Sequence, residues 1–223
     1  MIKVFFSIAF VLLLNASFGQ GQFGKFLPGV IYDNYGHKYV GYVAFAGKGL
    51  KGAGKPAHFQ NAATDAILYK ADSVSKADPT NVSTSAVRSF TILTDSFTIL
   101  RNFKMFGLKS RVRVQRAIGQ VVVGDGKVIL YNCNFRNIDR YGPGSNDYNT
   151  HYLNGYLVQI SGGDELIAVE EGINEFVPQM SMFLKDSEEI VTRVKNREYS
   201  YFKIEQLIRD YNALSKLSQS AAK

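Results

Sequence analysis

The stretch that decides the fold is VVVGDGKVILY, residues 121–131. Two apolar, β-branched runs, residues 121–123 and 127–131, flank the short turn sequence GDG. Glycine supplies the positive φ that tight hairpin turns require. The stretch therefore predicts two antiparallel strands joined by a tight turn.

Further strand patterns lie on both sides of this hairpin. Residues 38–45 are rich in β-branched and aromatic side chains, and residues 111–114 alternate between basic and apolar side chains, the period of a half-buried strand. The polar residues 72–85, which include Pro79, predict a surface loop. Other strands are predicted at residues 66–69, 87–93, 97–103, 152–160 and 165–170. Because no amphipathic helix separates these strands, they predict an antiparallel sheet or a partly closed barrel.

The hydrophobic period changes to that of a helix after residue 172. Pro178 is expected in the first turn of the first helix, Asp186 is expected to cap a second helix, and Ser200 a third. The apolar stripes of the first and third helices are Phe176, Met180, Phe183 and Leu184, and Ile204, Leu207, Ile208, Tyr211 and Leu214. The predicted fold class is therefore α+β and β-rich, with two or three C-terminal helices packed on the sheet.

The amino terminus has the three parts of a secretory signal peptide. Lys3 precedes a largely apolar run, residues 4–14, which is followed by small residues up to Gly19. A membrane-spanning helix needs roughly 20 apolar residues, so this run is too short to remain as an anchor. No Cys follows the run to carry a lipid. We therefore expect cleavage near Gly19, no transmembrane segment in the mature chain, and a periplasmic or secreted protein.

These patterns predict four parts of the chain: a signal peptide at 1–19, a β-rich domain at 20–172, a helical segment at 173–217 and a polar tail at 218–223. A hydrophobic content of 46% and a charged content of 20% are typical of a globular protein and exclude disorder. The single Cys excludes an intrachain disulfide and any multi-Cys metal site. This Cys133 lies in an apolar strand pattern and is expected to be a buried structural thiol.

Two glycine-rich cofactor patterns overlap after the strand at residues 38–45. Residues 47–52, GKGLKG, match G-x-G-x-x-G, and residues 49–55 fit G-x-x-x-x-G-K. Pro56 stands where a phosphate-binding loop needs Ser or Thr, and no helical pattern follows to present its N-terminus to a phosphate. The patterns therefore predict a Lys-bearing loop and no cofactor.

Catalytic and metal-binding patterns are incomplete. His37, His58 and His151 are far apart and match no metal-ligand spacing, and the sequence has no G-x-S-x-G motif. The adjacent carboxylates Asp164 and Glu165 are expected to be solvated rather than to form an acid–base pair. No catalytic or metal-binding residue is assigned on these patterns.

The charge pattern predicts one candidate binding site. Basic residues are concentrated between residues 101 and 116, in a chain with a net charge of +7. An anion-binding stripe is predicted at Lys109, Arg111, Arg113 and Arg116. Its expected partners are an anionic envelope glycan or lipid, or an acidic protein; export argues against nucleic acid. The alternative is a solvated strand face, with Arg111 and Arg113 on one side and Val112 and Val114 on the other.

The order of segments resembles a group of exported, functionally uncharacterised proteins of Bacteroidota. The resemblance covers residues 38–214 and rests on the stretches GYV at 41–43, SFTI at 89–92, GKVILY at 126–131, FLKD at 183–186, EIV at 189–191 and IRDYN at 208–212. It implies no catalytic residue. It does imply that Asp72, Ser73 and Val74 resemble the short site at which such bacteria O-glycosylate exported proteins, with Ser73 as the acceptor.

Two function classes follow from the sequence. The first is a non-enzymatic envelope protein that binds a partner or glycan through the basic stripe. The alternative is an envelope hydrolase whose site is assembled from distant residues, with His151, Tyr148, Tyr152 and a carboxylate as candidates. A cavity that brings these side chains together would favour the hydrolase.

Overall fold

The computed structural model describes residues 25–47, 56–57, 59, 62–74, 76–106, 111–140 and 148–221. Its eleven strands all belong to one sheet, and every strand pair is antiparallel. The strands of the first half are β1 (Leu27–Asp33), β2 (Lys38–Gly47), β3 (Pro56–Ala57), β4 (Ala62–Lys70), β5 (Thr80–Ser83) and β6 (Val87–Ile92). Those of the second half are β7 (Asp95–Phe106), β8 (Arg111–Val123), β9 (Val128–Arg140), β10 (Tyr148–Ile160) and β11 (Ile167–Ala168).

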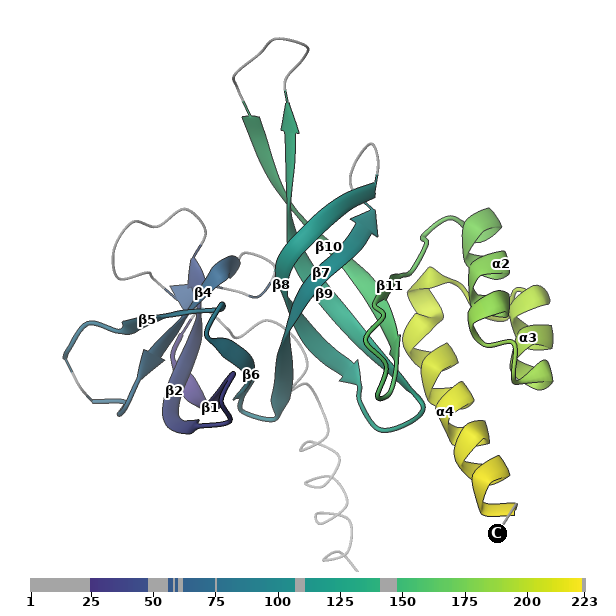
Figure 1. Ribbon diagram of the computed structural model, residues 1–223, viewed down its shortest axis with the longest axis horizontal. Helices are drawn as coiled ribbons and strands as arrows, with labels where there is room; N and C mark the ends of the chain where they lie inside the picture. The colour runs from purple at the N-terminus through teal and green to yellow at the C-terminus, as the bar shows by residue number, and fades with distance from the viewer. Residues whose placement is uncertain are drawn as a thin grey trace, which may run out of the picture.

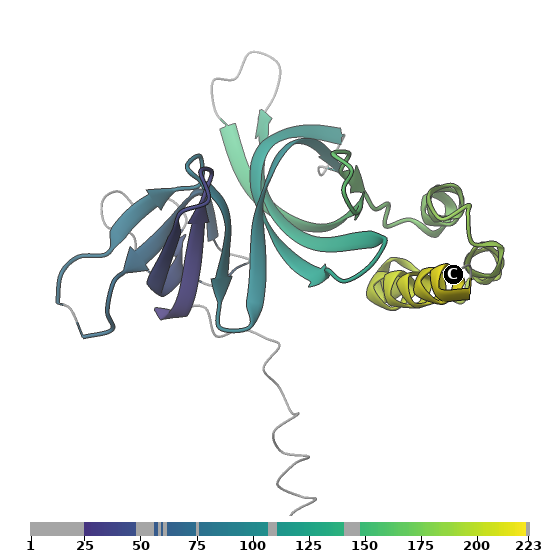
Figure 2. The same ribbon diagram turned by 60° about the horizontal axis from the view of Figure 1, so that its bottom comes forward.

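The sheet has a linear pairing order, β11-β10-β9-β8-β7-β6-β1-β2-β4-β5, with β3 paired to β2. The long strands β7 to β10 occupy the middle of the molecule, and the shorter strands β1 to β6 form one side of it (Figure 1). The second half curls on itself, as Figure 2 shows, so that β11 lies against β7 although three strands separate them in the pairing order. This confirms the predicted β-rich α+β class and its antiparallel sheet.

Most predicted strands are confirmed, and most of them are longer than the local patterns indicate. The hairpin around the GDG turn joins β8 to β9, and the predicted strand at residues 111–114 is the first part of β8. Three strands were not predicted, and one of them is the two-residue strand β3. β1 has Pro28 and Gly29 as its second and third residues, and both residue types are unusual inside strands. β5 lies within the stretch for which a polar loop was predicted, because its polar residues pair with β4 at the edge of the sheet.

An aromatic cluster forms the core of the first half of the sheet. The Phe97 ring stacks on Phe90 with a centroid distance of 4.9 Å and meets Phe45 and Phe59 at 5.1 and 5.7 Å. These rings pack with Ile99 and other buried aliphatic side chains of the surrounding strands. Since Phe97 and Ile99 lie at the start of β7, this core fixes the base of the two strands, β7 and β8, that carry the candidate site described below.

Three helices follow the sheet: α2 (Ile173–Phe183), α3 (Glu188–Lys195) and α4 (Ile204–Ala221), which the short 3-10 helix η2 (Tyr201–Lys203) precedes. They pack beside the end of the sheet that holds β8, β9 and β10 (Figure 1). The stripe predicted for the third helix is confirmed: Ile204, Leu207, Ile208 and Tyr211 are buried, and Leu214 packs against the same core. None of the helices in the described ranges is long and apolar enough to cross a membrane.

Three details of the helical segment differ from the predictions. Pro178 lies beyond the first turn of α2, inside the helix. Ser187, not Asp186, is the N-cap of α3, because the Asp186 carboxylate instead accepts hydrogen bonds from Lys127 and from the Tyr211 hydroxyl group, at 2.9 Å for the latter. Finally, α4 continues through Ala221, into the stretch for which a polar tail was predicted.

One buried amide joins α4 to the sheet. The Asn212 side chain donates a hydrogen bond to the Val128 carbonyl at 2.8 Å and accepts one from the Val128 N–H at 2.9 Å. It thereby extends the backbone hydrogen bonding of β9 to the helix. Gly126 makes this approach possible, because a Cβ at that position would collide with the Asn212 side chain. This glycine therefore has a packing role and not the conformational role that the turn sequence predicts, because among the described glycines only Gly36 and Gly162 have a positive φ.

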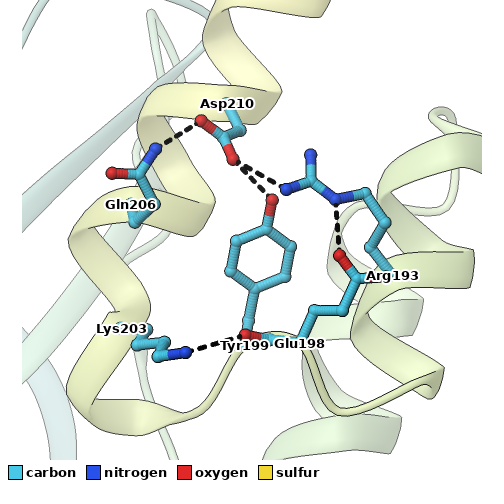
Figure 3. A network of polar contacts seen from close by, with 6 residues as sticks. All are labelled: Arg193, Glu198, Tyr199, Lys203, Gln206 and Asp210. Atoms are coloured by element: carbon cyan, nitrogen blue, oxygen red, sulfur yellow. Dashed lines mark hydrogen bonds and ion pairs between the residues drawn. The ribbon is translucent and has the colours of Figure 1, made fainter.

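A polar network holds α3 against α4 (Figure 3). The Asp210 carboxylate accepts hydrogen bonds from the Tyr199 hydroxyl at 2.5 Å, from the Gln206 amide at 2.6 Å and from the Arg193 guanidinium at 3.2 Å. Arg193 also pairs with Glu198 at 3.0 Å and lies over the Tyr199 ring. Partial burial opposes ionisation of Asp210, but these hydrogen bonds and the Arg193 charge outweigh it and lower the pKa of the carboxyl below its usual value.

The stability of the helical segment is therefore expected to fall in acid. Since the pKa of Asp210 is lower in the folded state, the ionised carboxylate stabilises the fold above the unfolded pKa of about 3.9 and loses this effect as the pH falls through the folded pKa. Hydrogen exchange between pH 6 and pH 2 should show opening of α4 at the acidic end. Asp210→Asn should flatten that pH dependence, whereas Asp78→Asn in an exposed loop should leave it intact; equal profiles for all three proteins would contradict the assignment.

Candidate functional site

The candidate site is built on the paired strands β7 and β8, where both strands interrupt their regular alternation. Leu100 and Phe103 are three residues apart and yet pack in the same core cluster, as do Val114 and Ala117 on the partner strand. In a regular strand, residues three apart point to opposite faces. Asn102 lies at this interruption with a positive φ of 54°. The interruption places basic residues three apart on one face of both strands.

The result is a group of four cations, which we call the basic quartet: Arg101, Lys104, Arg113 and Arg116. In the register of the two strands Arg101 lies directly opposite Arg116, and Lys104 directly opposite Arg113. Directly opposite residues in antiparallel strands have Cβ atoms about 4.5–5.5 Å apart, and like charges there are destabilising. No member of the quartet forms an ion pair with an acid among the described residues.

Neutral oxygen atoms of residues 84–87 hold two members of the quartet in place, Arg101 and Arg116. Arg101 Nη2 donates to the carbonyl groups of Thr84, Ser85 and Val87 at 3.1, 3.3 and 2.9 Å. Arg116 Nη1 donates to the hydroxyl group of the buried Thr84 at 3.3 Å, and its Nε is buried without a partner among the described residues. Burial, followed by the nearby charge of Arg116, lowers the pKa of Arg101. The two guanidiniums are thus held in place without being neutralised.

A hollow of about 440 Å³ opens beside this pair. Its lining consists of three arginines and two residues with amide side chains, namely Arg101, Asn102, Arg113, Gln115 and Arg116. We call it the arginine hollow. Guanidinium groups only donate hydrogen bonds and pair with oxyanions through two parallel N–H bonds. The lining is therefore suited chemically to a phosphate, sulfate or carboxylate group.

A larger cleft of about 540 Å³ adjoins the arginine hollow, and Arg101, Asn102 and Arg113 line both. The far wall of this cleft is formed by β11 and the residues before it, including Asp164 and Glu165. The Gln179 side chain fixes this wall to α2, because its amide donates to the Ala168 carbonyl at 2.7 Å and accepts from the Glu170 N–H at 2.9 Å. We call this space the β7–β11 cleft.

The structure describes the side chains of two of the four predicted anion-binding residues, Arg113 and Arg116. Arg113 and Arg116 come together in the arginine hollow, and Arg113 is exposed while Val112 and Val114 pack inward, as the strand pattern predicts. Arg111 is the first residue of β8, and its backbone pairs with that of Phe106 in β7. The Arg111 side chain lies outside the described part of the structure. Lys109 also lies outside the described residues.

Arg101, Asn102 and Gln115 belong to the hollow but were not assigned to the site from the sequence. The only feature of the sequence that points to Arg101 is that it lies in the basic stretch between residues 101 and 116. No sequence pattern points to Asn102 or Gln115. Their place in the hollow depends on the point at which both strands depart from regular alternation of side chains between the two faces.

The other sequence candidates lie elsewhere. Gly47 ends β2, and the next described residues, Pro56 and Ala57, form the short strand β3 paired with β2, so a strand follows the glycine-rich stretch where a phosphate-binding loop needs a helix. The rest of that stretch, 48–55, lies outside the described residues. Cys133 is buried, as predicted, and burial raises the pKa of its thiol.

Of the residues considered for a hydrolase or a metal site, the structure describes the side chain of His37 and not those of His58, Tyr148, His151 and Tyr152. His37 hydrogen-bonds Asp33 in an exposed turn at 2.8 Å, and His58 lies outside the described residues. The backbone of Tyr148, His151 and Tyr152 lies in β10, opposite β9, while their side chains are outside the described part. Among the residues whose placement is described, no group of three His, Cys, Asp or Glu side chains is arranged to hold a metal ion.

Ser73 lies in an exposed turn after β4, next to Asp72, whose carboxylate accepts the Val74 N–H at 3.0 Å. This exposure is what the predicted O-glycosylation requires, and the modification remains a prediction. Comparison of the chain with protein-family models, with curated proteins and with solved structures finds no match, so the function is argued from the site itself.

Proposed function

We propose that the protein is an exported, non-enzymatic binding module of the cell envelope that holds an anionic group in the arginine hollow. The observation that carries the proposal is the placement of Arg101 opposite Arg116 and of Lys104 opposite Arg113 with no acidic partner in the described chain. Such a placement disfavours the fold, and a bound anion removes the repulsion. The hollow beside the quartet has room for that anion.

The chemistry of the lining supports binding rather than catalysis. Guanidinium groups keep their proton in proteins, and amides do not titrate, so neither group serves as a general acid or base near neutral pH. The three guanidiniums and two amides of the hollow have the means to orient and neutralise an oxyanion. They supply no nucleophile and no proton relay.

Export and the envelope location rest on the amino-terminal sequence and on the resemblance to exported Bacteroidota proteins. If the signal peptide is cleaved, protein recovered from its native cells is expected to begin near Gln20. Mass spectrometry of the purified native product checks this. A product that retains Met1, or that fractionates with the cytosol, would contradict export and leave the anion site to be tested separately.

Binding of a simple oxyanion tests the proposed site. Isothermal titration of the protein with inorganic phosphate, and with sulfate, at low ionic strength should give saturable binding that weakens as salt is added. Replacing both Arg113 and Arg116 with Gln should weaken phosphate binding by about 100-fold, since a hydrogen bond to a charged group is worth about 1.5–3 kcal/mol and 1.4 kcal/mol is a factor of ten.

The matched control removes the same charge at a distant place. Lys195 and Arg197 are exposed at the end of α3, so the double substitution Lys195→Gln and Arg197→Gln lowers the net charge equally. Compared at about 0.1 M salt, where the Debye length is about 10 Å, this control should keep its phosphate affinity within about twofold of the unchanged protein, because exposed charges beyond that length are largely screened. Equal losses in both double variants would attribute binding to net charge, and absence of phosphate binding in the unchanged protein would reject the site.

A further inference from the structure

We infer that the ligand is a hydroxyl-bearing anion, a phosphorylated or acidic sugar, whose anionic group lies in the arginine hollow and whose hydroxyl groups lie in the β7–β11 cleft. The inference rests on the proposed function and adds the chemical class of the ligand. Its basis is that a space lined by arginines and amides adjoins a space that also has carboxylates in its lining. The two spaces share Arg101, Asn102 and Arg113 as a common wall.

The two spaces differ in their hydrogen-bonding groups. The arginine hollow has no carboxylate in its lining. The β7–β11 cleft has the exposed carboxylates of Asp164 and Glu165 on one wall and the Lys104 ammonium on the other. Carboxylates accept hydrogen bonds and the ammonium donates them. A group that fits between them must both donate and accept, which is what a hydroxyl group does.

The same lining disfavours the other anionic ligands. An acyl chain in the cleft would desolvate Asp164, Glu165 and Lys104 without giving them a partner, which is costly. A run of acidic side chains entering from the hollow would meet two carboxylates and be repelled. A neutral, polyhydroxylated body attached to one anionic group avoids both costs.

The dimensions and the rigidity of the cleft agree with a ligand of this size. Small-molecule sites are typically about 300–1,000 Å³, and the cleft of about 540 Å³ falls in this range before the hollow is added. Gln179 holds Ala168 of β11 and Glu170 to α2 through its two hydrogen bonds, and the turn carbonyl groups hold Arg101. The Gln159 amide donates to the Gly163 carbonyl group, next to Asp164, at 2.6 Å. The backbone of one wall and a guanidinium of the other are therefore positioned before the ligand arrives, which lowers the entropic cost of binding.

The test compares ligands that share an anionic group, a phosphate or a carboxylate, and differ in the body attached to it. Titrations with inorganic phosphate, a set of hexose phosphates and hexuronates, octyl phosphate and a hexaglutamate peptide cover the four classes. At least one sugar ligand should bind tenfold or more tightly than inorganic phosphate, while octyl phosphate and the peptide should show no such gain. Tighter binding of octyl phosphate or of the peptide, or no sugar ligand above phosphate, would overturn the inference.

A second pair of variants separates this inference from the proposed anion site. Replacing both Asp164 and Glu165 with Ala should abolish the gain of the sugar ligand over inorganic phosphate, while phosphate itself binds equally or more tightly because two negative charges are gone. If the carboxylates contact no hydroxyl group, the sugar ligand will instead gain affinity in parallel with phosphate, and the inference is wrong. Loss of phosphate binding in Arg113→Gln with Arg116→Gln would still support the anion site in that case.

Discussion

Replacing Phe97 with Ala is expected to lower the free energy of unfolding by about 3–5 kcal/mol. Phe97 is 1% exposed and contacts three other phenylalanine rings, so its truncation removes both buried apolar area and three ring contacts. Neighbouring side chains of a close-packed core relax only partly into such a cavity. Urea denaturation followed by circular dichroism measures the loss.

The matched control is Phe202→Ala, which removes the same atoms from a residue that is 91% exposed. This variant should change stability by no more than about 0.5 kcal/mol, the usual range for surface substitutions. Similar losses for the two variants would show that the aromatic cluster is not the core of the first half of the sheet. Because Phe97 precedes the quartet on β7, the core variant should also weaken phosphate binding at temperatures where it remains folded.

Replacing Asn212 with Ala is expected to lower the free energy of unfolding by about 2–4 kcal/mol. The substitution leaves the N–H and the carbonyl group of Val128 without their partner in a buried position, and each unpaired buried group costs about 1–3 kcal/mol. The loss should be local at first, with faster hydrogen exchange in α4 and in the turn before β9. Thermal or urea denaturation together with hydrogen exchange checks both parts of this expectation.

Asn174 provides the control for this substitution, since it is exposed in the first turn of α2. Asn174→Ala should leave stability nearly unchanged. A further variant, Asn212→Asp, keeps the acceptor for the Val128 N–H but replaces the donor to the Val128 carbonyl group with a carboxylate oxygen. A loss in Asn212→Ala no larger than that in Asn174→Ala would contradict the anchoring role of the amide.

The parts of the fold that depend on local pattern were predictable. The apolar stripe of α4 and the hairpin of β8 and β9 follow from the spacing of apolar residues along the chain. The positive φ predicted for the turn glycines is wrong, since neither Gly124 nor Gly126 has one. Burial of Cys133 follows from its apolar surroundings in the sequence. By contrast, three of the four residues of β5 are polar, and they form a strand because they pair with the edge of β4, which no local pattern indicates.

The candidate site was predictable in part for the same reason. The concentration of basic residues identifies the strands that carry Arg113 and Arg116, but strict alternation would place these two residues on opposite faces. They share a face because both strands break their alternation at the same level, next to Asn102. The Asp186 carboxylate likewise leaves its predicted capping role for Lys127 and Tyr211, which lie far from it in the chain.

The carbonyl groups that hold Arg101 have a mechanical consequence. They belong to the turn between β5 and β6 and to the first residue of β6, in one half of the sheet. The side chain that they hold comes from β7 and lines a hollow of the other half. Arg101 therefore links the two halves of the sheet through these hydrogen bonds. A ligand that shifts this guanidinium also changes its hydrogen bonds to the three carbonyl groups. Binding in the hollow is therefore coupled to β5 and β6, which the ligand does not contact.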